Sequence, residues 1–235
     1  MKNSRKQDFF KGIRQGIPIA LGYFSVSFGF GIMAVRSGIS ALAASVISIT
    51  NVTSAGQAAG VGIIAAGGTL IELILVQITI NLRYSLMALS LSQRLDPSFT
   101  PAHRLFAAYG ITDEIFAVCA AQPVPLTPWY MYGVILISVA GWVAGTATGG
   151  AAGEILPASV SSAMGIVLYG MFIAIVVPPA RRNRSILVVA VSAAALSTLF
   201  WYVFTSVSQG FAVIISSAAA AAAGAVLFPR EEGEA

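Results

Sequence analysis

Eight apolar stretches follow one another along this chain, and most of them are long enough to cross a lipid bilayer. They span residues 17–35, 41–56, 61–92, 105–122, 130–148, 159–178, 185–205 and 209–228. A helix needs about 20 apolar residues to cross a hydrocarbon layer of about 30 Å. The chain has only 13 basic and 9 acidic residues and a mean hydropathy of +0.85, so lipid is the solvent for most of it. We predict an all-α, polytopic transmembrane helix bundle of six to eight membrane segments, some of them broken or re-entrant.

The two ends of the chain differ in character from its middle. Residues 1–16 are basic, and the apolar run that follows is longer than the core of a signal peptide, so we expect it to remain as the first transmembrane helix. Residues 17–228 then form a single transmembrane transport domain, and residues 229–235 an acidic tail. Basic residues that flank apolar runs orient a membrane chain, and no nucleic-acid motif accompanies them. Cys119 is the single cysteine, so it cannot form a disulfide within the chain.

The number of crossings depends on two of the apolar segments. Segment 41–56 is short and is followed by small and polar residues, while segment 105–122 carries Gly110, Asp113 and Glu114 at its middle. If both re-enter, six helices cross, both termini face the cytoplasm, and 12 of the 13 basic residues lie inside. Eight crossings give nine inside and four outside. The positive-inside rule favours the six-crossing layout.

A glycine recurs every four residues in the segment that begins near residue 130. The stripe consists of Gly141, Gly145, Gly149 and Gly153. Such spacing places small residues on one helix face, where a neighbouring backbone can approach closely. The stripe therefore predicts helix packing and no chemistry.

Charged residues inside apolar runs mark the candidate transport route. Glu72 and Arg83 stand in one run, eleven residues apart and so on nearly the same helix face, and Asp113 and Glu114 interrupt a later one. Intramembrane charges usually line a solute or proton path. We expect the face with Glu72 and Arg83 to point toward the protein interior or a water-filled cavity. We also expect Arg83 to contact Asp113 or Glu114. A purely structural ion pair is the alternative, and Asp113 could also serve with Thr112 as a helix N-cap.

The stretch from Asn51 to Gly60 is the candidate substrate cradle. A broken helix there exposes amides at one new end and carbonyls at the other, which suits a zwitterion. The candidate substrate-binding residues are Asn51, Ser54, Gly56, Gln57 and, from the next apolar run, Asn81. The alternative interpretation of this stretch is a flexible connector between two membrane passes. The alternative role of Asn81 is to form hydrogen bonds with backbone groups at an irregularity in its helix. His103 is expected to be a polar loop residue.

Enzyme signatures are absent from the sequence. It has one histidine, one cysteine, no HExxH, no GxSxG and no phosphate-binding loop. We therefore expect no enzyme activity, no cofactor and no metal, with the energy for transport coming from a gradient or another subunit.

Three stretches carry a resemblance to a known family. They are GIRQGIPIALGYFSVSFGFG (12–31), SAGQAAGVGIIAAGGTLIELILVQITINLRYSLMALSL (54–91) and YGITDEIFAV (109–118). With these stretches the chain resembles the AzlC family, the large subunit of bacterial branched-chain amino acid exporters. Residues 130–235 match mainly in hydropathy and length.

The resemblance implies export of valine, leucine or isoleucine, linked to protons, by a permease that works with a small membrane partner of the AzlD type. In such a transporter one carboxylate among Glu72, Asp113 and Glu114 would carry the proton. Two other functions remain open: a noncatalytic membrane scaffold whose charges are structural, and a channel or transporter for another small solute.

Overall fold

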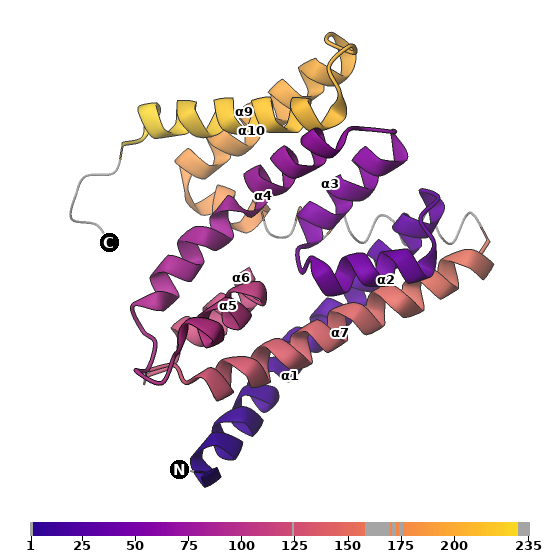
Figure 1. Ribbon diagram of the computed structural model, residues 1–235. Coiled ribbons are helices and arrows are strands. Elements are labelled where there is room, and N and C mark those ends of the chain that lie inside the picture. Colours follow the sequence, from indigo (N-terminus) through magenta and orange to yellow (C-terminus); the bar gives the residue numbers. More distant parts are fainter. Residues whose placement is uncertain (1, 124, 158–169, 171–172, 174–175, 230–235) are drawn as a thin grey trace.

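The computed structural model describes the chain apart from residues 1, 124, 158–169, 171–172, 174–175 and 230–235 (Figure 1). The helices in the described residues are α1 (Lys2–Arg36), α2 (Ala41–Thr50), α3 (Ser54–Ala65), α4 (Leu70–Ser92), α5 (Pro101–Tyr109), α6 (Asp113–Ala120), α7 (Pro128–Ile155), α9 (Arg184–Tyr202) and α10 (Gln209–Leu227). Among them, α1, α4, α7, α9 and α10 are long and apolar enough to cross a membrane. The predicted all-α membrane bundle is confirmed. The predicted segment 159–178 lies largely, and the acidic tail almost wholly, outside the described residues.

Two pairs of short helices interrupt the long ones. In the first pair, α2 and α3 contain 10 and 12 residues, or about 15 and 18 Å of rise, which is about half of a 30 Å hydrocarbon layer. The chain breaks between them at Asn51–Thr53, and Thr53 begins α3 because its hydroxyl accepts the N–H of Gly56 at 3.4 Å. The apolar run 61–92 is therefore not one helix, since α3 ends at Ala65 and α4 begins at Leu70 after Gly67 turns with a φ of 68°.

The second pair, α5 and α6, is shorter still, with 9 and 8 residues. Its break lies at Gly110–Thr112, and the hydroxyl of Thr112 accepts the N–H of Ile115 at 3.4 Å, so Thr112 is the N-cap of α6 and Asp113 its first residue. His103 lies within α5 and not in a loop, which corrects the sequence-based expectation. Its ring is held 2.6 Å from the Tyr132 hydroxyl of α7.

The directions of the long helices show that each short pair is re-entrant. Helices α1 and α7 run parallel, because the backbone at Gly12 approaches Tyr130 and that at Gly31 approaches Gly150. Helix α4 runs the opposite way: its end meets the start of α7, where Leu95 bridges Leu126 (Figure 1). Each short pair thus returns to the side from which it began. This agrees with the six-crossing layout for the chain up to α7, since eight crossings would make α4 parallel to α1.

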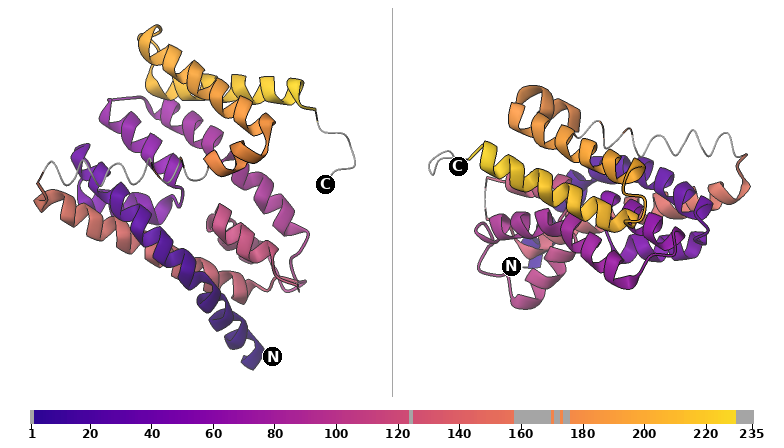
Figure 2. Two further views of the ribbon diagram at one scale, coloured as in Figure 1. Left: turned by 180° about the vertical axis from the view of Figure 1, so that it is seen from behind. Right: turned by 90° about the horizontal axis from the view of Figure 1, so that it is seen from above.

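Helix α7 runs alongside α1 in both views of Figure 2, and its glycine stripe faces α1. A Cβ atom at Gly141, Gly145 or Gly149 would overlap the backbone carbonyl oxygen of Ala20, Phe24 or Phe28, respectively. At Gly153 a Cβ would lie 3.1 Å from the Cα of Ile32. The predicted packing role of the stripe is confirmed, and it fixes α1 and α7 as the rigid spine of the molecule.

Candidate functional site

The tips of the two re-entrant pairs meet at the level of Trp142, the middle of α7. The hydroxyl of Tyr109, at the end of α5, donates to the carbonyl of Ile49 near the end of α2. The hydroxyl of Tyr84 in α4 lies 3.5 Å from Thr53, the N-cap of α3. The starts of α3 and α6 border the same cavity, through Ser54 and Asp113, and each has first-turn amides that carry partial positive charge.

Arg83 and Asp113 form the predicted ion pair, with Nη2 2.9 Å from Oδ2. The expectation that Arg83 contacts one of the two α6 carboxylates is confirmed. The guanidinium also lies over the ring of Tyr84, 5.1 Å from its centroid. Both partners keep accessible surface, 48% for the Arg83 side chain and 39% for that of Asp113. The pair is therefore open to a solute or a proton.

Glu114 faces a different partner from its neighbour. Its Oε2 accepts a hydrogen bond from the hydroxyl of Tyr23 in α1 at 2.6 Å. The same hydroxyl lies 2.5 Å from the Oγ1 of Thr112. Tyr23 and Thr112 are buried, while Glu114 is exposed. The Tyr23 hydroxyl thus connects the start of α6 to α1.

A cavity of about 580 Å³ lies where these groups meet, a volume within the usual range of about 300–1,000 Å³ for small-molecule sites. Its polar lining comes from Tyr23, Ser54, Arg83, Tyr84, Thr112, Asp113 and Glu114. Its apolar lining includes Ile19, Val26, Val52, Trp142 and Val176. The cavity therefore combines both signs of charge with an aliphatic and aromatic wall.

The wall at Trp142 is positioned by a chain of buried hydrogen bonds. The indole Nε1 donates to Oε1 of Gln57 at 2.7 Å, and Nε2 of Gln57 donates to the Ser48 hydroxyl at 2.8 Å. The Ser48 hydroxyl lies 2.7 Å from that of Thr146. Tyr23 packs edge-on against Trp142, with ring centroids 5.3 Å apart. Gln57 thus acts behind the cavity wall, as a residue that positions Trp142.

Asn51, Gly56 and Asn81 also lie behind the cavity, around Gln77. The amide Nε2 of Gln77 donates to the carbonyl of Gly56 at 2.7 Å, which fixes its orientation because a carbonyl only accepts. The Oε1 of Gln77 then accepts from Asn51 at 3.2 Å and from Asn81 at 3.1 Å. Of the five candidate substrate-binding residues, Ser54 alone is among the described residues that line the cavity. The other four organise the break between α2 and α3.

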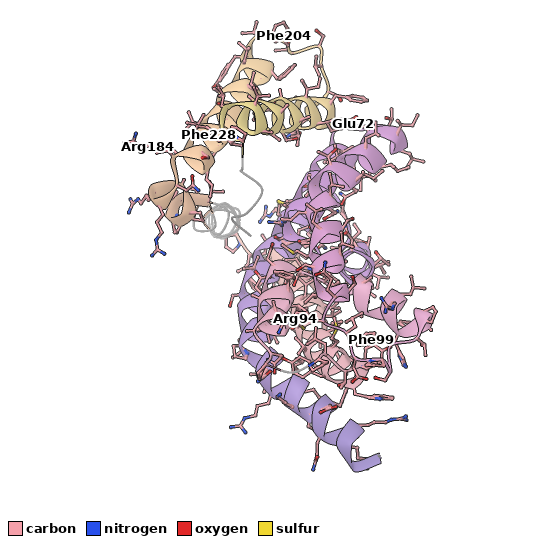
Figure 3. The ribbon with its side chains drawn as sticks, turned by 90° about the vertical axis from the view of Figure 1, so that its left-hand side faces the viewer. Glu72, Arg94, Phe99, Arg184, Phe204 and Phe228 are labelled. Atoms are coloured by element: carbon pink, nitrogen blue, oxygen red, sulfur yellow. The ribbon has the colours of Figure 1, made fainter. Side chains whose placement is uncertain are left out.

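Glu72 lies away from this site, beside α10. It is 4% exposed, and its Oε1 accepts from the hydroxyl of Ser208 at 2.6 Å and from the amide of Gly210 at 2.7 Å. Figure 3 shows Glu72, in the first turn of α4, next to the α9 and α10 pair, whereas Arg94, just beyond the other end of α4, lies far from that pair. The face of α4 that carries both residues does point toward the protein interior or a cavity, as expected, because Glu72 is buried against α10 and Arg83 borders the cavity. The two side chains nevertheless lie in different places and share no partner among the described residues. The polar face of α4 toward α3 is formed by Gln77, Asn81 and Tyr84.

Tyr23, Trp142 and Gln77 were not identified as site residues from the sequence. A usable signal existed for the two aromatic residues. Each places a polar atom at the middle of an apolar run, and a buried phenol or indole usually finds a hydrogen-bond partner. Gln77 carries a similar signal, as an amide side chain within the leucines and isoleucines of α4.

A sequence model of the family described as AzlC protein matches residues 18–156. The chain belongs to the AzlC family. The matched residues include both re-entrant pairs and the charged residues of the cavity. The chain is a multi-pass membrane protein with a transport-related role.

Relatives of this AzlC-family chain are themselves described as membrane proteins. The inner membrane protein YgaZ of Escherichia coli K12 is 31% identical over 202 residues, which cover 82% of this chain and 82% of YgaZ. A membrane protein of Archaeoglobus fulgidus is 30% identical over 196 residues, covering 83% of this chain and 86% of that protein. A membrane protein of Helicobacter pylori is 24% identical over 185 residues, covering 76% and 80%. No solved structure matches the chain.

Proposed function

We propose that this AzlC-family protein is a secondary transporter that exports branched-chain amino acids such as valine, leucine and isoleucine, in exchange for protons. The observation that carries the proposal is the cavity at the tips of the two re-entrant pairs, which places Arg83, Asp113 and Glu114 beside an apolar wall. A branched-chain amino acid likewise has a charged part, its zwitterionic head, and an apolar part, its aliphatic side chain.

The head group would be bound by the charged and polar side of the cavity. The substrate carboxylate lies toward the guanidinium of Arg83 and the first-turn amides of α3 at Ser54. Its ammonium lies toward the carboxylates of Asp113 and Glu114. The aliphatic side chain lies against Val26, among the other apolar residues of the lining.

The proton would be carried by a carboxylate of the cavity. Glu72, the third candidate, is occupied by Ser208 and Gly210 and lies outside the described cavity lining. Residues 17–228 form the transport domain, with both termini on the cytoplasmic side of a bacterial inner membrane. A small AzlD-type membrane subunit is the proposed partner.

Counterflow of labelled valine into proteoliposomes tests this function. Full-length protein, reconstituted with and without the small subunit, is loaded with unlabelled valine and diluted into labelled valine. We expect saturable accumulation that leucine and isoleucine inhibit and that glutamate does not. Flux that does not saturate would indicate a channel. Absence of flux with and without the small subunit would favour a scaffold and would overturn the proposal.

A further inference from the structure

The two neighbouring carboxylates of the cavity have unequal partners. Asp113 lies 2.9 Å from a guanidinium, whereas Glu114 receives a hydroxyl from Tyr23. Among the described residues, no cation forms an ion pair with Glu114. The guanidinium of Arg83 balances the charge of Asp113, whereas the phenol beside Glu114 is a neutral donor. Glu114 is therefore the carboxylate of this pair whose charge no described side chain balances.

The contact between Tyr23 and Glu114 tolerates both protonation states. Thr112 and Glu114 lie 2.5 and 2.6 Å from the Tyr23 hydroxyl, which has one proton and can also accept. When Glu114 is ionised, the phenol donates to it and accepts from Thr112. When Glu114 is protonated, the carboxyl can donate to the phenol oxygen. A proton can thus arrive or leave without rearrangement of α1 and α6.

The charges that face Glu114 favour one ammonium group or one proton. Arg83 and Tyr84 come from α4 and Tyr23 comes from α1, while Asp113 precedes Glu114 in α6. With Arg83, Asp113 and Glu114 all ionised, the cavity carries one net negative charge. The ammonium of an amino acid can pair with that charge, but a proton on Glu114 removes it. The two cations therefore exclude each other at one site.

We propose that a proton and the substrate's ammonium compete for Glu114, and that this competition makes the transporter an obligatory exchanger of one proton for one amino acid. The inference rests on the proposed function. On the outward leg Glu114 is ionised and a neutral zwitterion is bound. On the inward leg Glu114 carries the proton and the cavity holds no amino acid. Each cycle moves one amino acid out and one positive charge in.

The test measures the half-saturation constant for valine counterflow at a series of pH values, with equal pH on both sides. For the unmodified protein we expect the half-saturation constant to rise as the pH falls, because protons then compete with valine for Glu114. Simple competition by one proton gives a rise of about tenfold for each pH unit of decrease in the acidic range. In Glu114→Gln the constant should no longer depend on pH, and valine should no longer move protons, as read by a pH dye in the lumen. Glu154→Gln, a change at an exposed carboxylate near the end of α7, is the matched control and should keep the original profile.

Tyr23→Phe keeps the test decisive if Glu114→Gln does not fold. Loss of the hydroxyl removes a donor that stabilises ionised Glu114, so the rise in half-saturation should begin at a higher pH. An unchanged profile in Tyr23→Phe, or wild-type pH dependence in Glu114→Gln, would overturn the inference. Saturable valine counterflow that is independent of pH in the unmodified protein would overturn it and leave the transport function standing. A lack of any valine counterflow would instead refute the proposed function.

Discussion

The carboxylate of Glu72 in α4 caps the first turn of α10, because its Oε1 accepts the backbone N–H of Gly210 at 2.7 Å. Thr69 and Glu72 have the spacing of a capping box, and Thr69 does accept the amide of Glu72 at 3.2 Å. The carboxylate itself, however, is bound to a different helix. Ser208 is the N-cap of α10 but its side chain makes no cap hydrogen bond there, and it donates to Glu72 instead. One acidic side chain therefore couples α4 to the α9 and α10 pair.

Removal of this carboxylate should weaken the attachment of α10. Glu72→Ala leaves the amide of Gly210 without its acceptor, which costs about 1–3 kcal/mol for a buried group. We expect a lower unfolding temperature of the purified protein in detergent and faster proteolysis between α9 and α10. Glu72→Gln, which retains an oxygen acceptor, should lose less stability and should keep the pH profile of transport. A changed pH profile in Glu72→Gln would show that this carboxylate handles protons.

The pair between Arg83 and Asp113 should matter for transport far more than for stability. Exposed ion pairs contribute about 0.2–1 kcal/mol, and both side chains are partly accessible. We expect Arg83→Asp and Asp113→Arg each to reduce valine counterflow by about tenfold or more, the loss of one charge-assisted contact to the substrate. Their unfolding temperatures should change little.

The combined charge swap should recover part of the transport lost in the single variants. Arg104→Glu reverses an exposed charge on α5 and serves as the control. If the swap is no better than the worse single variant, the two groups do not act as a pair. Full transport after neutralisation of both would show that Arg83 and Asp113 form a purely structural ion pair, which holds helices together and does not bind substrate.

Much of the architecture could be predicted because lipid leaves few choices. Long apolar runs must be helical, and the glycines of α7 predict a close neighbour without naming it. A break before α3 was also predicted, but over residues 51–60, whereas the structure confines it to Asn51–Thr53 and residues 54–60 belong to α3. The break at Gly110–Thr112 lies within the segment 105–122 that was expected to re-enter. The contact from Arg83 to an α6 carboxylate followed from the cost of leaving an intramembrane charge unpaired.

The candidate site was less predictable, because helical spacing does not reveal which neighbour a face meets. Glu72 and Arg83 share nearly one face of an ideal helix, yet α10 covers the first and the cavity borders the second. Gln57 was expected to bind substrate, but it is turned toward the indole of Trp142. These assignments depend on contacts 85 or more residues apart in the chain, which single-helix patterns do not encode.

Gln57 should control the shape of the cavity without contacting the substrate. Gln57→Leu leaves the buried indole N–H of Trp142 without its acceptor, at a cost of about 1–3 kcal/mol. The Ser48 hydroxyl loses one donor but keeps its contact with Thr146. We expect the half-saturation constant for valine to rise several-fold, while the maximal rate changes less. Trp142 emission, measured with Trp129 and Trp201 replaced by phenylalanine, should shift because the indole changes its surroundings.

The control for Gln57→Leu is Gln93→Leu, which alters an exposed glutamine at the C-cap of α4. It should leave both the emission and the half-saturation constant unchanged. An unaltered Trp142 emission in Gln57→Leu would mean that the wall is positioned by other contacts, such as the edge-on ring of Tyr23.

The contact between α1 and α7 should be the least tolerant part of the molecule. At Gly145 an added Cβ would meet the backbone of Phe24, and a backbone in the middle of a helix cannot turn aside as a side chain can. Gly145→Ala should therefore destabilise the protein by about 1–3 kcal/mol, and Gly145→Val by more, because overpacking grows with volume. Gly62→Ala is the matched control: it is also in a helix, and its nearest foreign atom would lie 3.8 Å from the new Cβ. Unfolding temperature and the yield of monodisperse protein measure the difference. Equal stability of the Gly145 and Gly62 variants would mean that α1 and α7 can separate at little cost, and that their contact does not hold the molecule together.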